Sequence, residues 1–166
     1  KNALINGFLR LYDVALHEAE QPDPRAYDSF NAFFTRALRA GARARPADTD
    51  LVAMPVDGTL SEHGRMRDDT LIQAKGMTYS TTALLAGRQA LAERFSGGSF
   101  ATVYLAPYNY HRIHMPFTGT LREAWHVPGD LFSVNATTTA AVPCVFARNE
   151  RVICVFDTAA GPMAVV

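Results

Sequence analysis

Apolar residues recur with a helical period near the start of the chain. They stand three or four positions apart, as on one face of an amphipathic helix, at Leu4, Phe8, Leu11, Tyr12, Ala15 and Leu16. The run Gln-Pro-Asp-Pro at residues 21–24 ends the pattern, because proline lacks an N–H and disfavours helix in the residue before it. The spacing predicts a helix over residues 2–20.

A second helical stripe follows the prolines. Asp28 or Ser29 suits the N-cap position, and Gly41 suits the end of the helix. The stripe itself consists of Phe30, Phe33, Phe34, Ala37 and Leu38. We therefore expect residues 1–45 to form an N-terminal helical segment.

From residue 51 the pattern changes to short apolar runs separated by turn residues. Strands are predicted at residues 51–54, 59–63 and 71–74, with turns at Asp57-Gly58 and around Asp68-Asp69. One further helix is predicted over residues 80–95, capped by Ser80. Strands are then predicted at residues 100–105, 118–127, 143–147, 151–156 and 162–166.

Helices first and strands afterwards indicate an α+β fold. We expect N-terminal amphipathic helices followed by a β-sandwich or open-barrel core with one further helix. The predicted division is a helical segment at residues 1–45 and a β-rich catalytic core at residues 46–166.

The composition argues against several kinds of function and location. Lys and Arg total 16 and Asp and Glu total 16, so there is no basic surplus and nucleic acid is not an expected partner. Cys144 and Cys154 form no CxxC pattern, and we expect small buried side chains in a reducing compartment. No apolar run approaches the ~20 residues that a membrane-spanning helix needs. The chain begins inside a helical pattern and ends inside a strand pattern, so we expect a fragment or one product of processing.

Four arginines occur close together without an intervening acid, at Arg36, Arg39, Arg43 and Arg45. One interpretation is a solvated face, with positive charge favourable near the C-terminus of a helix. The other is contact with anionic lipid headgroups, which attract basic clusters beside amphipathic helices.

Residues 104–134 contain three of the five histidines, His111, His114 and His126. His111 and His114 would share a face on a helix, but prolines and a preceding strand disfavour helix here, and an odd spacing on a strand sends them to opposite faces. We therefore expect no metal site. One interpretation is that one histidine faces a pocket while the other supports it; the alternative is a pair of structural histidines. His17, His63 and His126 are interpreted as surface or structural residues.

Asp57 follows a predicted strand in the sequence Met-Pro-Val-Asp-Gly. It either hydrogen-bonds its own turn, as is usual for Asp-Gly, or orients a histidine and stabilises the imidazolium. The chain contains no GxSxG motif and no phosphate-binding glycine loop. An acid and a base are present without an obvious nucleophile, an absence that is informative if the third group lies on another polypeptide.

Several long runs resemble the bacterial phosphatidylserine decarboxylases, in the order of that family and across nearly the whole chain. They are SFNAFFTRALR, MPVDGTLSEHG, QAKGMTYS, YLAPYNYHRIHMPFTG, VPGDLFSVN and FARNERVICVFDTAAGPMAVV. In that family a proenzyme cleaves itself at Leu-Gly-Ser-Thr, and the serine becomes a pyruvoyl group on a short α chain. This sequence contains no Leu-Gly-Ser-Thr, so it resembles a portion of the longer β chain, and the pyruvoyl serine lies outside it.

The resemblance implies roles for five residues. Asp57 and His114 would form a self-cleavage triad with the missing serine, and His111 would serve decarboxylation. Phe132 and Ser133 are our hypothesis for substrate contacts. The implied reaction converts phosphatidylserine to phosphatidylethanolamine through a Schiff base with the pyruvoyl group.

The resemblance also implies partners and a location. We expect the α chain of the same proenzyme, a homodimer of α/β heterodimers, and an anionic membrane surface. The expected location is peripheral, on the cytoplasmic face of the bacterial inner membrane. The alternative is a non-catalytic lipid-binding β-sandwich module, a degenerate relative that has lost its serine.

Overall fold

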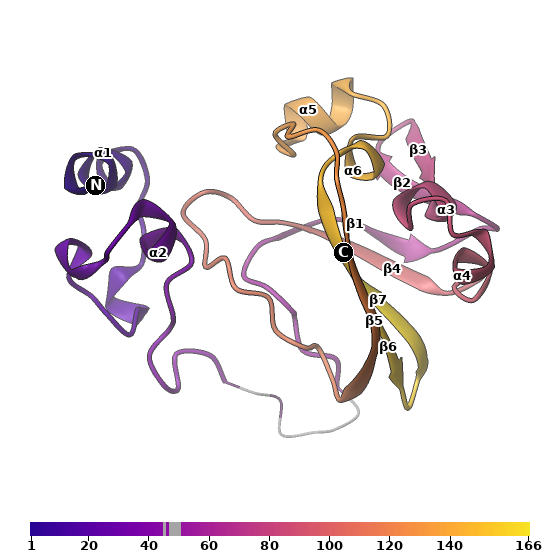
Figure 1. Ribbon diagram of the computed structural model, residues 1–166, viewed down its shortest axis with the longest axis horizontal. Coiled ribbons are helices and arrows are strands. Elements are labelled where there is room, and N and C mark those ends of the chain that lie inside the picture. The colour runs from indigo at the N-terminus through magenta and orange to yellow at the C-terminus, as the bar shows by residue number, and fades with distance from the viewer. Residues whose placement is uncertain (45, 47–50) are drawn as a thin grey trace. The chain divides into compact units, whose positions relative to one another are not determined.

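The computed structural model describes residues 1–44, 46 and 51–166 (Figure 1). The chain forms two compact units. The first consists of Lys1–Thr59 and Leu105–Phe117, and the second of Leu60–Tyr104 and Thr118–Val166. The division at residue 45 that the sequence predicted stays a prediction, and Arg45 lies outside the described residues.

The first unit is built on short helices and an aromatic cluster. Its elements are α1 (Asn2–Leu11), the 3-10 turns η1 (Leu16–Glu18) and η2 (Pro24–Ala26), and α2 (Phe30–Phe34). Ile5, Val14 and Phe33 are buried. The ring of Phe8 packs edge-on against Phe33, with 5.9 Å between the ring centroids. Burying such side chains is worth about 1.5–3 kcal/mol each, so the aromatic cluster stabilises the unit.

Both N-terminal helices are shorter than predicted. The predicted cap of α2 is confirmed, because the Ser29 hydroxyl accepts a hydrogen bond from Ala32 N at 3.0 Å. The last residues of the two predicted helices pair with each other instead: Glu20 N donates to Ala37 O and Arg39 N to Glu18 O, each at 2.9 Å. Backbone groups that pair across the unit cannot also pair within a helix.

An irregular return segment, residues 105–117, completes the first unit. It is joined to residues 53–55 by two backbone hydrogen bonds, from Ala53 N to Pro116 O at 2.9 Å and from His114 N to Pro55 O at 2.8 Å. The strand predicted at residues 51–54 is wrong: these residues are irregular. The pairing nevertheless brings the segment before Asp57 alongside the segment that carries the histidines.

The second unit contains the strands. β1 (Thr59–Arg65) pairs with β4 (Ser99–Tyr104), and β2 (Thr70–Ala74) pairs with β3 (Met77–Ser80). A three-stranded antiparallel sheet has the order β5 (Gly119–Val127), β6 (Arg151–Thr158), β7 (Gly161–Val165). The α+β class is confirmed. Within the described residues the strands form three small sheets and no closed barrel.

Four short helices accompany these sheets: α3 (Thr81–Leu84), α4 (Gln89–Glu93), α5 (Ala136–Ala141) and α6 (Val145–Arg148). The helix predicted over residues 80–95 begins at its predicted cap, since Ser80 Oγ accepts from Ala83 N at 3.0 Å. It is then split into α3 and α4, because Ala86 and Gly87 have φ angles of 59° and 82°, which no right-handed helix contains.

The strand predicted at residues 143–147 is wrong, because residues 145–148 form α6. The buried side chain of Gln73 fixes this segment. Its Oε1 accepts from Val145 N at 2.9 Å, and its Nε2 donates to Thr139 O and Val142 O, each at 2.8 Å. A short apolar run cannot be assigned to strand or helix by its period alone. A glutamine 72 positions away decides it here.

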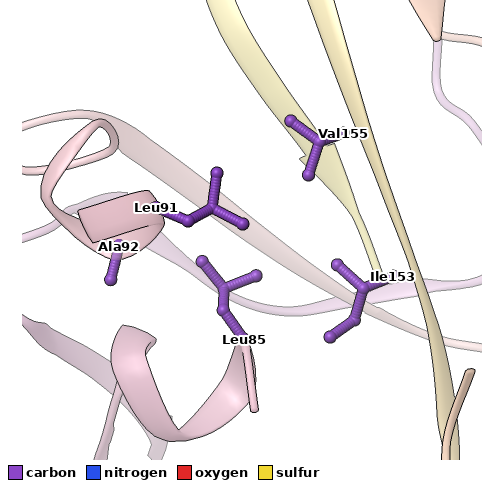
Figure 2. Packing of buried hydrophobic residues seen from close by; sticks show 5 residues of the cluster. All are labelled: Leu85, Leu91, Ala92, Ile153 and Val155. Carbon is purple, nitrogen blue, oxygen red and sulfur yellow. The ribbon is translucent and has the colours of Figure 1, made fainter. Parts of the chain in front are cut away.

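The main core of the second unit lies between the helices and the three-stranded sheet. Leu85 and Leu91 point towards Ile153 and Val155 of β6 (Figure 2). Ile153 and Val155 are fully buried, whereas Val152 is exposed, as the alternation of side chains along a strand requires. Both cysteines are free and half-buried.

Candidate functional site

The carboxylate of Asp57 is held by the guanidinium of Arg43. Arg43 Nε donates to Oδ1 at 3.0 Å and to Oδ2 at 3.1 Å, and Nη2 also donates to Oδ2. These hydrogen bonds, reinforced by the positive charge, hold the pKa of Asp57 below its usual range. Asp57 is therefore an anion at neutral pH.

Arg43 also binds a second carboxylate, that of Glu18. The contact is bidentate, with Nη1 to Oε1 and Nη2 to Oε2 both at 2.9 Å. The pKa of Glu18 is lowered, chiefly by these hydrogen bonds, and the pKa of Arg43 is raised by both carboxylates. One guanidinium thus joins two carboxylates that lie 39 residues apart in the sequence.

His114 lies on the return segment, where its imidazole is exposed. Its Nε2 is 2.8 Å from the hydroxyl of Tyr110, a residue that is itself buried. The two rings stack with centroids 5.5 Å apart. Tyr110 therefore fixes the orientation of an imidazole whose other nitrogen has no hydrogen-bond partner among the described residues.

His111 has a different environment three residues earlier. Its Nδ1 is 2.9 Å from Asn109 O, and its ring lies 4.0 Å from the ring of Phe34. Burial lowers the pKa of His111, and the hydrogen bond to Asn109 opposes that shift. A carbonyl oxygen only accepts hydrogen bonds, so Nδ1 keeps its hydrogen. Nε2 is then the nitrogen that is open to take up a proton.

Arg36 anchors the start of this histidine segment. It is only 3% exposed, and its Nη2 donates to Tyr108 O at 3.2 Å and Asn109 O at 3.3 Å. Its Nε and Nη1 are buried without a partner among the described residues, and burial lowers its pKa. The interpretation of the arginine cluster as a solvated face is wrong for Arg36, because its role is to hold backbone next to His111.

Asp57, Arg43, Glu18 and Arg36 border a small open cavity in the first unit, with a volume of about 190 Å³. Its lining is mostly polar and comprises Asp13, Ala15, Glu18, Arg36, Leu38, Arg43, Asp57, Tyr108, Asn109 and Tyr110. The cavity therefore joins the carboxylate of Asp57 to the backbone that leads into His111.

Phe132 and Ser133 belong to the second unit, in a loop fixed against residues 148–150. Phe132 N donates to Asn149 Oδ1 at 3.0 Å, and Asn149 Nδ2 donates to Phe132 O at 2.8 Å. The Arg148 guanidinium lies over the Phe132 ring at 4.7 Å. Ser133 is exposed, and its Oγ accepts from Asn135 N at 3.4 Å, so its hydroxyl also serves a local turn.

Gly129 lets this loop approach the chain closely. A Cβ at this position would lie 2.2 Å from Arg148 O and 2.7 Å from Asn149 C, so no side chain fits. Asp130 N then donates to Arg148 O at 2.9 Å, and Glu150 N donates to Asp130 O at 2.8 Å. The loop is held by backbone as well as by side chains.

The site residues predicted from the sequence lie in both units. Asp57, His111 and His114 lie in the first unit, and Phe132 and Ser133 in the second. Within the described residues no hydrogen bond joins Asp57 to His114; the link is the backbone bond from His114 to Pro55. Their assignment as a triad stays a prediction.

The sequence interpretation missed Glu18, Tyr110 and the role of Arg43. The only signal for Arg43 was its place in an arginine cluster, and its acidic partners lie 25 and 14 residues away. Tyr110 is four residues before His114, a spacing without meaning in an irregular segment. Neither partner could be identified from a periodic pattern.

In the part of the chain that the structure describes, no group of three or more His, Cys, Asp or Glu side chains could hold a metal ion. Among the same residues, no helix has the length and apolar character needed to cross a membrane.

Comparison with known proteins links the chain to one family. The family model for phosphatidylserine decarboxylase matches residues 30–166. The chain is 56% identical to a phosphatidylserine decarboxylase proenzyme of Alkalilimnicola ehrlichii, over 100% of this chain and 58% of that protein. Proenzymes of the same name from Bordetella avium and Yersinia enterocolitica are 55% and 56% identical, over 100% and 97% of this chain and 56% and 55% of those proteins. The chain thus spans a little over half the length of these relatives.

Proposed function

The chain belongs to the phosphatidylserine decarboxylase family, and on that premise we propose that it is the β-chain portion of a self-cleaving proenzyme that decarboxylates phosphatidylserine to phosphatidylethanolamine. The observation that carries the proposal is the 56% identity over 100% of the chain to a relative named as such a proenzyme. The arrangement of acid and base groups in the first unit supports it.

In self-cleavage, His114 is the general base and Asp57 its anionic partner. His114 would take the hydroxyl proton of the serine supplied by the rest of the proenzyme, while Asp57 would stabilise the resulting imidazolium. Three observations support these roles. The His114 imidazole is exposed and can be reached, Asp57 is an anion at neutral pH, and His114 N bonds to Pro55, two residues before Asp57.

In decarboxylation, His111 is the group that moves a proton. Because Asn109 O occupies Nδ1, proton exchange with the substrate would occur at Nε2. The pyruvoyl group, formed from a serine outside this chain, would supply the electron sink for loss of carbon dioxide. Contact with Phe34 would limit the access of water to the His111 ring.

Phe132 and Ser133 are proposed to contact the substrate. The exposed side of Phe132 offers an apolar contact, and the Ser133 hydroxyl offers a hydrogen bond. Their loop is fixed to Asn149, so the two side chains would be in position before the substrate arrives.

The proposed partners are the α chain of the same proenzyme, a second α/β heterodimer, and an anionic membrane. We place the protein peripherally on the cytoplasmic face of the bacterial inner membrane. The exposure of Leu4 and Leu11, which lie seven residues apart on one side of α1, supports membrane contact.

Two histidine substitutions in the full-length proenzyme test the proposal. His114→Ala should prevent cleavage, because the serine loses its base. His111→Ala should allow cleavage yet lower turnover by about a hundredfold or more, the usual contribution of a general acid or base. Intact mass would report the cleavage, and chromatography of the lipid product would report the turnover.

His63→Ala is the matched control, because His63 is exposed on β1 in the second unit and should change neither readout. Equal processing and turnover in all three variants would contradict the proposal. If the proenzyme without substitutions remains one uncut chain, a non-catalytic lipid-binding module is favoured instead.

A further inference from the structure

All five N–H donors of Arg43 have a partner. An arginine carries five N–H donors. Here Nε faces Asp57, Nη1 faces Glu18 Oε1 and Ala42 O at 2.9 and 2.7 Å, and Nη2 faces both carboxylates. A lysine has one nitrogen and could not bridge two carboxylates in this planar arrangement. The site therefore depends on a guanidinium.

The contact leaves one oxygen of Asp57 open to a further donor. Oδ2 receives two hydrogen bonds from Arg43, whereas Oδ1 receives one. An ionised carboxylate has about four lone-pair sites, so Oδ1 can accept from an imidazole without losing Arg43. Arg43 and a histidine can thus bind Asp57 at the same time.

The exposure of these groups argues against a mainly stabilising role. The side chains of Arg43, Glu18 and Asp57 are 42%, 27% and 30% exposed. Ion pairs that water reaches to this degree contribute little to folding. Their geometry, with one carboxylate held bidentately on each side of Arg43, is better suited to fixing orientation.

We propose that Arg43 is a positioning residue for self-cleavage, which fixes the charge and orientation of the Asp57 carboxylate and is itself fixed by Glu18. This inference rests on the proposed function. It adds Arg43 and Glu18 to the proposed self-cleavage residues Asp57 and His114. Together, the side chains of Glu18, Arg43 and Asp57 carry two negative charges and one positive charge, so one net negative charge remains to stabilise an imidazolium.

The surroundings of Asp57 define the expected pH dependence. The charged and titratable groups that act on it or border the same cavity are Arg43, His114, Arg36, Glu18, Asp13, Tyr108 and Tyr110. Arg43 is the largest cause of the lowered pKa of Asp57. Without it the carboxylate would take up a proton at a higher pH, and the anionic form would be lost sooner as the pH falls.

The test uses the full-length proenzyme and follows self-cleavage over a range of pH. Arg43→Gln should slow cleavage by about tenfold to a hundredfold, the usual penalty for a misplaced catalytic group. It should also move to higher pH the part of the acid limb of the rate profile that protonation of Asp57 sets. Arg43→Lys should restore the position of that limb, because the charge returns, but only part of the rate.

Glu18→Gln separates orientation from charge. It keeps the charges of Arg43 and Asp57 but weakens the contact that fixes Arg43, so it should slow cleavage without moving the acid limb upward. Arg25→Gln is the matched control. It breaks a different exposed ion pair of the same unit, between Arg25 and Asp23 with 3.1 Å from Nε to Oδ1, and should leave both rate and profile unchanged.

If the Arg43→Gln variant cleaves itself at the same rate and with the same pH profile as the proenzyme without substitutions, the inference is overturned. Circular dichroism would show whether each variant folds; if Arg43→Gln does not, a normal rate in both Arg43→Lys and Glu18→Gln would also overturn it. If Asp57→Asn cleaves normally, the proposed function itself fails. If Asp57→Asn blocks cleavage and Arg43→Gln has no effect, only this inference fails.

Discussion

His111 and His114 lie three residues apart on one irregular segment, yet their imidazoles have unlike surroundings. His111 is half-buried against Phe34 and held by Asn109 O, whereas His114 is exposed and held by Tyr110. The distinction follows from contacts made across the first unit. It suits the separate tasks proposed for the two histidines: the exposed His114 can be reached by the serine hydroxyl, whereas His111 is partly shielded from water.

Truncating Phe34 should therefore change the titration of His111. Phe34→Ala opens the imidazole to water, so its pKa should rise from its lowered position towards the ordinary value of 6.5. The sign follows from the cause: burial disfavours the charged form, and its removal favours that form. NMR titration of the histidine ring protons would measure the change. Phe100→Ala, in β4 of the second unit, is the control, and an unchanged pKa in Phe34→Ala would contradict burial as the cause.

The candidate residues could be found from the sequence only where the signal was local. Asp57 and His114 stand in recognisable runs, so they could be named. Arg43 could not be assigned to Asp57, because the ion pair joins residues 14 apart that share no helix or strand. Long-range ion pairs leave no period in a sequence.

The helices and strands show the same division between local and distant causes. Ser80, and Ser29 as one of two candidates, were predicted as caps and are confirmed, because a cap and the amide it binds are three residues apart. The last residues of the two predicted N-terminal helices and the helix α6 were not, since residues 18–20 pair with residues 37–39 and the side chain of Gln73 fixes α6.

Gln73 should accordingly be a strong determinant of stability. Gln73→Leu keeps a similar volume but leaves Val145 N, Thr139 O and Val142 O without their partner. A buried unsatisfied group costs about 1–3 kcal/mol, so we expect a loss of about 3 kcal/mol or more. Urea denaturation would measure it. Gln89→Leu, at an exposed glutamine in α4, should cost less than about 0.5 kcal/mol, and equal losses in the two variants would contradict the assignment.

At the scale of the whole molecule, the order of helices and strands was sufficient to predict the α+β class. It did not indicate that residues 105–117 return to the first unit after four strands of the second. A pattern of apolar residues reports which face of an element is buried. It does not report which part of the chain that face meets.

The exposed face of α1 provides a test of membrane contact. Leu4 and Leu11 are 60% and 78% exposed, and replacing both with serine in the full-length protein should weaken binding to anionic vesicles several-fold, because apolar area inserts between headgroups. Co-sedimentation with vesicles of anionic phospholipid would measure it.

Leu121→Ser with Val152→Ser is the matched control, since these residues are 52% and 54% exposed in the second unit. Unchanged sedimentation of the Leu4 and Leu11 variant would exclude α1 as the contact.

The absence of a side chain at Gly129 has a mechanical consequence. The backbone of residues 148–150 occupies the space beside it and is bonded to Asp130 by two backbone hydrogen bonds, so we expect the loop bearing Phe132 and the strand beginning at Arg151 to move together. A ligand meeting this loop would encounter a stiff surface, and little conformational freedom would remain to be lost on association.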